Sequence, residues 1–144
     1  MRRLVLLSVL ALLLACDPTI VIPGGALSGE TKPVPASWTF SDAVDTVQLE
    51  TRPEEPYSVN VWGVAVGSDF YVASGRKDNA WARHIAADDR VRLRIEGDVY
   101  EMRAVRDDSP EARERFLARA KEKYDFEPDP DDAAEAVLFR LEAR

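Results

Sequence analysis

The fold class is decided by one stretch of the chain, RVRLRIEGDVYEMRAVR at residues 90–106. Apolar and polar residues alternate on both sides of Gly97-Asp98, which is typical of two strands that each bury one face. A two-residue loop at Gly97-Asp98 predicts a hairpin in which Ile95 lies opposite Tyr100. The other pairs on the buried face of this register are Leu93 with Met102 and Val91 with Ala104.

The opposite face of this hairpin is rich in arginine. The predicted register pairs Arg94 with Glu101, which is favourable, and Arg92 with Arg103, which is not. The exposed face is therefore basic, within a chain whose formal net charge is −7. Two interpretations stay open: a solvated strand face with acidic neighbours, or a face that binds anions.

Further segments have the pattern of strands. Residues 47–51 alternate apolar and polar side chains. Residues 57–66 and 70–73 are rich in Val and aromatic residues, and Gly67-Ser68 between them predicts a hairpin, because Gly supplies the positive φ of a type II′ turn. A last strand is predicted at residues 136–141, with one side formed by Val137, Phe139 and Leu141. Trp38 and Trp62 are expected to belong to the core or to line a cavity.

Two segments have the spacing of amphipathic helices. In residues 78–87, Asp78 is available as the N-cap, and the apolar spacing is set by Ala80, Trp81, His84, Ile85 and Ala87. The second helix begins at Ser109 as N-cap with Pro110 in its first turn, and its apolar face is formed by Ala112, Phe116, Leu117, Ala120 and Tyr124. The chain is thus predicted to be mostly β with two helices, an α+β fold.

Composition limits the class of protein. A length of 144 residues corresponds to one domain, and 46% hydrophobic residues suffice to bury a core. One Cys excludes an intramolecular disulfide framework, and one His excludes a multi-histidine metal site. The net charge of −7 argues against nucleic acid as the main partner, since phosphate contacts need clustered Lys and Arg side chains.

An acidic run near the C-terminus places carboxylates at alternate positions, as calcium loops do: Asp125, Glu127, Asp129 and Asp131. Pro130 stands where such a loop needs Gly, and Ala136 stands where it needs a bidentate Glu. We interpret the run as an acidic linker and expect no metal there; the alternative is a weak calcium site.

The N-terminus has the pattern of an export signal. Arg2 and Arg3 precede an apolar run at residues 4–15, which is shorter than the ~20 residues needed to cross a bilayer. The run ends in Leu13-Leu14-Ala15-Cys16, which resembles the bacterial lipobox. The resemblance implies removal of residues 1–15, acylation of Cys16 by chains such as palmitate, and a lipoprotein anchored in a bacterial membrane and facing the periplasm. The alternative is a secretory signal with an unrelated cysteine.

The residues after Cys16 suggest a spacer. Residues 17–35 contain four Pro and three Gly without a sustained period. We therefore expect residues 16–37 to be a lipidated tether and residues 38–144 to be the folded domain. Asp17, next to the modified cysteine, resembles the signal that retains some lipoproteins at the inner membrane.

The order of motifs in residues 47–144 resembles the split β-barrel superfamily. The segments that carry the resemblance are Ala73-Ser74-Gly75, Trp81-Ala82-Arg83-His84-Ile85, Asp89-Arg90-Val91-Arg92-Leu93 and Tyr100-Glu101-Met102-Arg103-Ala104. This superfamily includes pyridoxamine-phosphate-oxidase-like flavoproteins and deazaflavin-dependent nitroreductases. The resemblance implies an antiparallel split barrel and, because these proteins are commonly dimers, a possible homodimer.

In the cofactor-binding members, a Ser-Gly strand end and the following helix contact FMN or a deazaflavin. The resemblance carries this role to Ser74, Gly75, Arg76, Lys77, Trp81, Arg83 and His84. Cations beside a helix N-terminus suit a phosphate, which supports the assignment chemically.

One departure from the superfamily pattern bears on function. Where the nitroreductase-like families have a basic Gly-Arg-Lys loop, this chain has Arg52-Pro53-Glu54-Glu55-Pro56, and its two glutamates would repel a phosphate. We therefore expect a non-enzymatic binding or structural domain without a cofactor. The alternative is a flavin- or deazaflavin-dependent oxidoreductase.

The anchor can be tested by the substitution Cys16→Ser. It is expected to abolish membrane attachment without unfolding the domain, because acyl chains on this thiol would be the attachment. Membrane fractionation measures the first effect and a thermal melt the second. A variant that still partitions fully with membranes would show that the lipobox interpretation is wrong.

Overall fold

The computed structural model describes residues 24–144. The predicted signal peptide, Cys16 and Asp17 lie outside the described residues. The described elements are β1 (Glu30–Lys32), the 3-10 helix η1 (Thr39–Ala43), β2 (Val47–Thr51), β3 (Tyr57–Val61), β4 (Gly63–Val66), β5 (Asp69–Ser74), α1 (Ala80–Ala87), β6 (Arg90–Ile95), β7 (Asp98–Arg106), α2 (Pro110–Tyr124), α3 (Pro130–Glu135) and β8 (Val137–Ala143).

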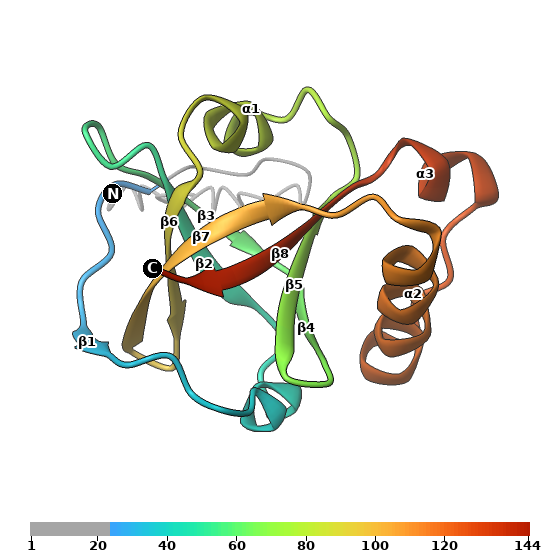
Figure 1. Ribbon diagram of the computed structural model, residues 1–144, viewed down its shortest axis with the longest axis horizontal. Coiled ribbons are helices and arrows are strands. Elements are labelled where there is room, and N and C mark those ends of the chain that lie inside the picture. The colour runs from blue at the N-terminus through green and yellow to red at the C-terminus, as the bar shows by residue number, and fades with distance from the viewer. Residues whose placement is uncertain (1–23) are drawn as a thin grey trace, which may run out of the picture.

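The strands form one mostly antiparallel sheet in the order β3-β2-β6-β7-β8-β5-β4, with β1 added parallel to β7. The sheet curls on itself, with α1 above it and α2 and α3 beside β5 and β4 (Figure 1). The predicted fold class is confirmed. Among the described residues, no helix has the length and apolar character needed to cross a membrane.

The two end strands of the sheet, β3 and β4, are consecutive in the chain and are separated only by Trp62. Gly63 begins β4 at this corner. A Cβ atom on Gly63 would lie 2.4 Å from Cζ of Phe70 and 3.3 Å from Cγ2 of Val47. Phe70 is fully buried, so only glycine fits where the chain passes from one end of the sheet to the other.

The predicted register of the β6–β7 hairpin is wrong by two residues, although the predicted buried face is right. The loop is Glu96-Gly97, with φ of 51° and 95°, as a type I′ turn requires. The observed pairs are Leu93 with Tyr100, Val91 with Met102, Arg92 with Glu101 and Arg94 with Val99. This register places Arg92 opposite a carboxylate instead of opposite Arg103. Because side chains alternate with a period of two, a shift by two keeps the same residues in the core.

The N-terminal segment covers part of the basic face of this hairpin. The Arg92 guanidinium donates to the Leu27 carbonyl at 3.0 Å and to the buried carboxylate of Glu50 at 3.2 Å. The Leu27 N–H donates to the same carboxylate at 2.6 Å, and Arg94 donates to the Ser28 carbonyl at 2.9 Å. The Gly24 N–H also donates to the Ser58 carbonyl at 2.8 Å, so the chain is part of the fold from Gly24 onward, earlier than the predicted boundary at Trp38. A Pro- and Gly-rich composition did not prevent it from adding to the sheet.

The helices differ from the prediction in detail. Asn79, and not Asp78, is the residue before α1. The predicted start of α2 is confirmed, since Ser109 Oγ accepts a hydrogen bond from the Ala112 N–H at 3.2 Å. Part of the predicted acidic linker forms α3, because Pro130 suits a first turn and the Asp129 carboxylate accepts from the Asp131 N–H at 3.0 Å.

Strands β4, β5 and β8 bury both of their faces. Phe70, Val72 and Phe139 point into the core enclosed by the curled sheet. Val64, Val66 and Leu138 belong to a second apolar cluster, which includes Ala112 and Phe116 of α2. This arrangement explains why these strands carry consecutive apolar residues and do not alternate. It also fixes α2 on the outside of the sheet.

The corner at Gly63 provides a stability test. Gly63→Ala is expected to lower the free energy of unfolding by about 1–3 kcal/mol, the usual range for overpacking a core, because the added methyl group meets the Phe70 ring. Gly25→Ala is the matched control, since a Cβ there has no neighbour within 4 Å. Urea denaturation of both variants measures the difference. Equal midpoints would contradict the packing argument.

Candidate functional site

The last residue of β5 and the turn that follows it contain four of the predicted cofactor-binding residues. Ser74 is buried, and its hydroxyl donates to the Arg76 carbonyl at 2.5 Å and accepts from the Asn79 amide at 2.7 Å. Gly75, Arg76 and Lys77 are exposed. The Ser74 side chain therefore holds the turn together through internal bonds.

The cations of this turn lie close to carboxylates of the same chain. Arg76 makes two hydrogen bonds to Asp78, at 2.9 and 2.8 Å, and these bonds lower the pKa of the Asp78 carboxyl. A depression of about 440 Å³ next to the turn is lined by both signs of charge, including Lys77, Asp108 and Glu135. A phosphate placed there would face carboxylates as well as cations.

The remaining predicted residues lie on α1 and point in different directions. Trp81 is only 7% exposed, and its ring lies 5.7 Å from that of Phe139 in the core. His84 Nδ1 is 2.9 Å from Thr51 Oγ1, and the Tyr57 ring packs edge-on against the imidazole. Burial lowers the pKa of His84, and the charges of Arg52 and Arg83 lower it further.

The structure therefore brings only part of the predicted set together. Lys77 and Arg83 line a cavity of about 180 Å³ together with Arg106. Ser74, Trp81 and His84 do not line it. Cofactor pockets usually measure about 300–1,000 Å³, so this cavity does not fit a flavin as it stands.

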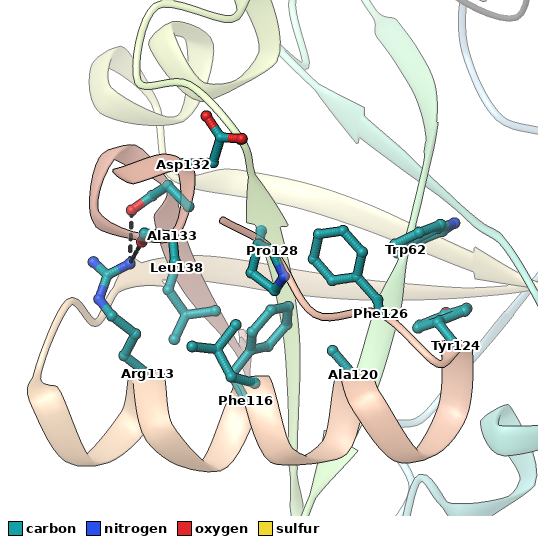
Figure 2. A pocket seen from close by; sticks show the side chains of 14 residues that line it. Trp62, Arg113, Phe116, Ala120, Tyr124, Phe126, Pro128, Asp132, Ala133 and Leu138 are labelled. Atoms are coloured by element: carbon teal, nitrogen blue, oxygen red, sulfur yellow. Dashed lines mark hydrogen bonds between the residues drawn. The ribbon is translucent and has the colours of Figure 1, made fainter. Parts of the chain in front are cut away.

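A second cavity, of about 190 Å³, lies on the outer side of the sheet and is apolar. Figure 2 shows α2 along one side of it, with Phe116 and Ala120 directed inward, and Phe126 and Pro128 on the opposite side. Leu138 of β8 and Ala133 of α3 complete the wall. The other lining residues are Trp62, Ala73, Gly75, Arg113, Leu117, Tyr124, Asp132 and Ala136.

Three aromatic rings stand at one end of this cavity. Trp62 and Tyr124 are stacked, with centroids 4.6 Å apart and planes inclined by 9°. Phe126 meets the Trp62 ring edge-on at 5.2 Å. The Tyr124 hydroxyl donates to the Gly63 carbonyl at 3.0 Å, so the end of α2 is tied to the corner of the sheet. Burial raises the pKa of Tyr124.

The other end of the cavity is closed by α3, which Arg113 holds in place. The guanidinium donates to the carbonyls of Ala133 at 2.7 Å and Ala136 at 3.0 Å, as the dashed lines in Figure 2 mark, and it also contacts Asp108. These charge-assisted bonds occupy the side of Arg113 that faces α3. The wall thus presents mainly apolar side chains to the cavity. The guanidinium of Arg113, its main charged group, is engaged by other residues of the chain.

Sequence reasoning found only part of this cavity. The sequence predicts Trp62 to be core or cavity lining, and it does line the cavity. The sequence places Phe126 and Pro128 in an acidic linker, whereas in the structure both line the cavity. A signal was present in Val137-Leu138-Phe139, since a strand with apolar residues at consecutive positions must be covered on both faces. Among residues 24–144, no group of three or more His, Cys, Asp or Glu side chains could hold a metal ion.

The curled sheet is similar to solved structures of three bacterial proteins. A conserved hypothetical protein from Mycobacterium tuberculosis matches with a TM-score of 0.62 at 19% identity, over 74% of this chain and 77% of that one. A candidate pyridoxamine 5′-phosphate oxidase from Listeria innocua matches with a TM-score of 0.58 at 12% identity, over 72% and 87%. An FAD-binding protein from Mesorhizobium loti matches with a TM-score of 0.50 at 17% identity, over 74% and 86%.

The fold is a split β-barrel. The resemblance seen in the sequence is thereby confirmed for the architecture, which this chain shares with the Listeria and Mesorhizobium proteins. At these identities the likeness extends to the fold alone, and function must be argued from the site. The sequence matches no protein-family model and no curated protein.

Truncation of Trp81 tests whether it belongs to the core. Trp81→Ala is expected to cost about 3–5 kcal/mol of unfolding free energy, a large share of a typical stability of about 5–15 kcal/mol. Trp62→Ala is the control, because Trp62 is 46% exposed and its loss is expected to cost less. Thermal melts compare them. A Trp81→Ala variant that melts within a degree or two of the parent would instead place the indole in an open ligand cleft.

Proposed function

We propose that this chain is a bacterial lipoprotein whose split-barrel domain is a non-enzymatic binding domain, and that it takes a small uncharged ligand in the apolar cavity between α2 and α3. The observation that carries the proposal is the cavity itself. About 190 Å³ of space is lined almost wholly by apolar side chains and opens beside exposed aromatic rings. Concave apolar sites with few polar groups are the usual form of small-molecule sites.

The flavin alternative has less support from the geometry. Arg76 and Arg106 are each paired with a nearby aspartate, and the Ser74 hydroxyl is engaged within its own turn. The cavity that Lys77 and Arg83 share is small for a cofactor. An oxidoreductase would need these cations free to hold a phosphate, and the indole of Trp81 available to a ring system.

Membrane attachment rests on the sequence of residues 13–16, which resembles a lipobox. Two or three acyl chains on one cysteine would hold the chain stably at a membrane. Small uncharged apolar molecules partition into membranes, so a domain held there would meet them at high local concentration. The anchor and the cavity are therefore compatible with one role.

The two functions can be separated by titration of the full chain in a mild detergent, with detergent alone as the blank. We expect toluene and methylcyclohexane, two uncharged probes of similar size, to raise the melting temperature, because ligands that bind only the folded state stabilise it. FMN is expected to leave both the melting temperature and its own visible spectrum unchanged.

The opposite pattern would overturn the proposal. Stabilisation by FMN at micromolar concentration, or a purified protein that is yellow, would favour the oxidoreductase. Failure of both apolar probes to stabilise the chain would exclude the cavity as a ligand site.

A further inference from the structure

We infer that the cavity between α2 and α3 selects uncharged ligands that present a single aromatic ring, and that Trp62, Tyr124 and Phe126 distinguish such a ring from an aliphatic one. The inference rests on the proposed function, because it names the ligand class of the same cavity.

Size limits the ligand first. The cavity measures about 190 Å³. An apolar cavity of about 150 Å³ in another protein binds benzene, so the space here suits one ring with a small substituent. Larger cofactors and long acyl chains would not fit within these walls.

The aromatic end of the cavity favours a ring over an aliphatic body. Trp62 and Phe126 are 46% and 37% exposed, and they are two of the three exposed large hydrophobic side chains among the described residues. Their edge-to-face contact, and the stack of Trp62 on Tyr124, leave further ring surface uncovered at the mouth. Aromatic pairs gain stability beyond their buried area, which an aliphatic molecule of equal size would not obtain.

Charge in the wall argues against an anionic or cationic ligand. Arg113 is engaged by two carbonyls and by Asp108, and the only other charged residue of the wall is Asp132, which is exposed. A charged group inside an apolar cavity would lose its hydration without gaining a partner. The ligand is therefore uncharged.

Besides the end with the exposed rings, displacement of α3 offers a second route into the cavity. No residue of α3 is buried, so displacing this short helix exposes little apolar surface. The contacts that hold it are chiefly the bonds from Arg113 to Ala133 and Ala136. Segments with few buried contacts open at low free-energy cost, which gives a ring a route to the interior.

The test compares toluene with methylcyclohexane by calorimetric titration of the full chain in detergent, with a detergent blank. Toluene is expected to bind roughly two- to tenfold more tightly, the range that aromatic contact geometry provides. Trp62→Leu keeps an apolar cover but removes a ring, so it is expected to reduce this ratio toward one while methylcyclohexane still binds. A purely structural role of Trp62 would lower the affinity for both molecules alike.

A matched pair of variants in α3 tests whether the ligand binds in this cavity. Ala133→Leu puts three carbon atoms into the cavity and is expected to abolish binding of both probes. Ala134→Leu makes the same change on the same helix at a residue that does not line the cavity, and it is expected to bind both normally. Melting temperatures of both variants confirm that they fold.

The outcomes separate the two proposals. Equal affinity for both probes, lost in Ala133→Leu, would overturn the aromatic selectivity and leave the apolar binding domain intact. No binding of either probe would overturn both. A tryptophan emission spectrum that depends on protein concentration without any probe in the parent, and does not do so in Trp62→Leu, would assign the aromatic end to an interface between two copies and would also overturn the inference.

Discussion

The corner at Gly63 is the constraint on which the rest of the structure depends. The chain leaves one end of the sheet at Val61 and begins the other end at Gly63, with Phe70 packed where a Cβ would stand. The sheet can curl around its core only if the backbone passes this close to the Phe70 ring. The same glycine carbonyl accepts bonds from Tyr124 at 3.0 Å and Lys123 at 2.9 Å, so the corner also positions the end of α2.

The cavity is a consequence of that corner. Trp62, the residue between the two end strands, cannot join either core and is left on the outer side, where it stacks on Tyr124. Helix α2 covers β4 and β5, but its small residue Ala120 and the loop after Tyr124 leave space toward β8. Phe126 and α3 line that space, although no residue of α3 is itself buried. The site is thus built from residues distant in sequence, on the face of the sheet opposite the barrel core.

Much of the fold could be predicted from the sequence, because the hydrophobic period of a strand or helix and the capping of a helix depend on residues that are near one another in the chain. The hairpin at residues 90–106, the Ser109 cap and the last strand follow from such signals, as does the resemblance to a split barrel. The hairpin register could not be predicted by the same route, since both Glu96-Gly97 and Gly97-Asp98 satisfy a two-residue turn and the choice depends on Arg92 meeting Glu101. The cavity depends on tertiary packing of Phe126 and Leu138, which no local pattern contains. The prediction of cofactor-binding residues rested on the resemblance to a family. In the structure Ser74, Trp81 and His84 each contact a different part of the chain and do not form one site.

The central claim is that the ligand site of this split barrel is the apolar cavity and not the basic turn after β5. Nuclear magnetic resonance of the full chain, with isotope-labelled methyl groups and added toluene, tests it most directly. We expect the largest shift changes at the methyl groups of Ala120, Ala133 and Leu138, with Ala86 and Ala104 beside the Lys77–Arg83 cavity unaffected. Changes confined to Ala86 and Ala104, or none at any of these methyl groups, would contradict it.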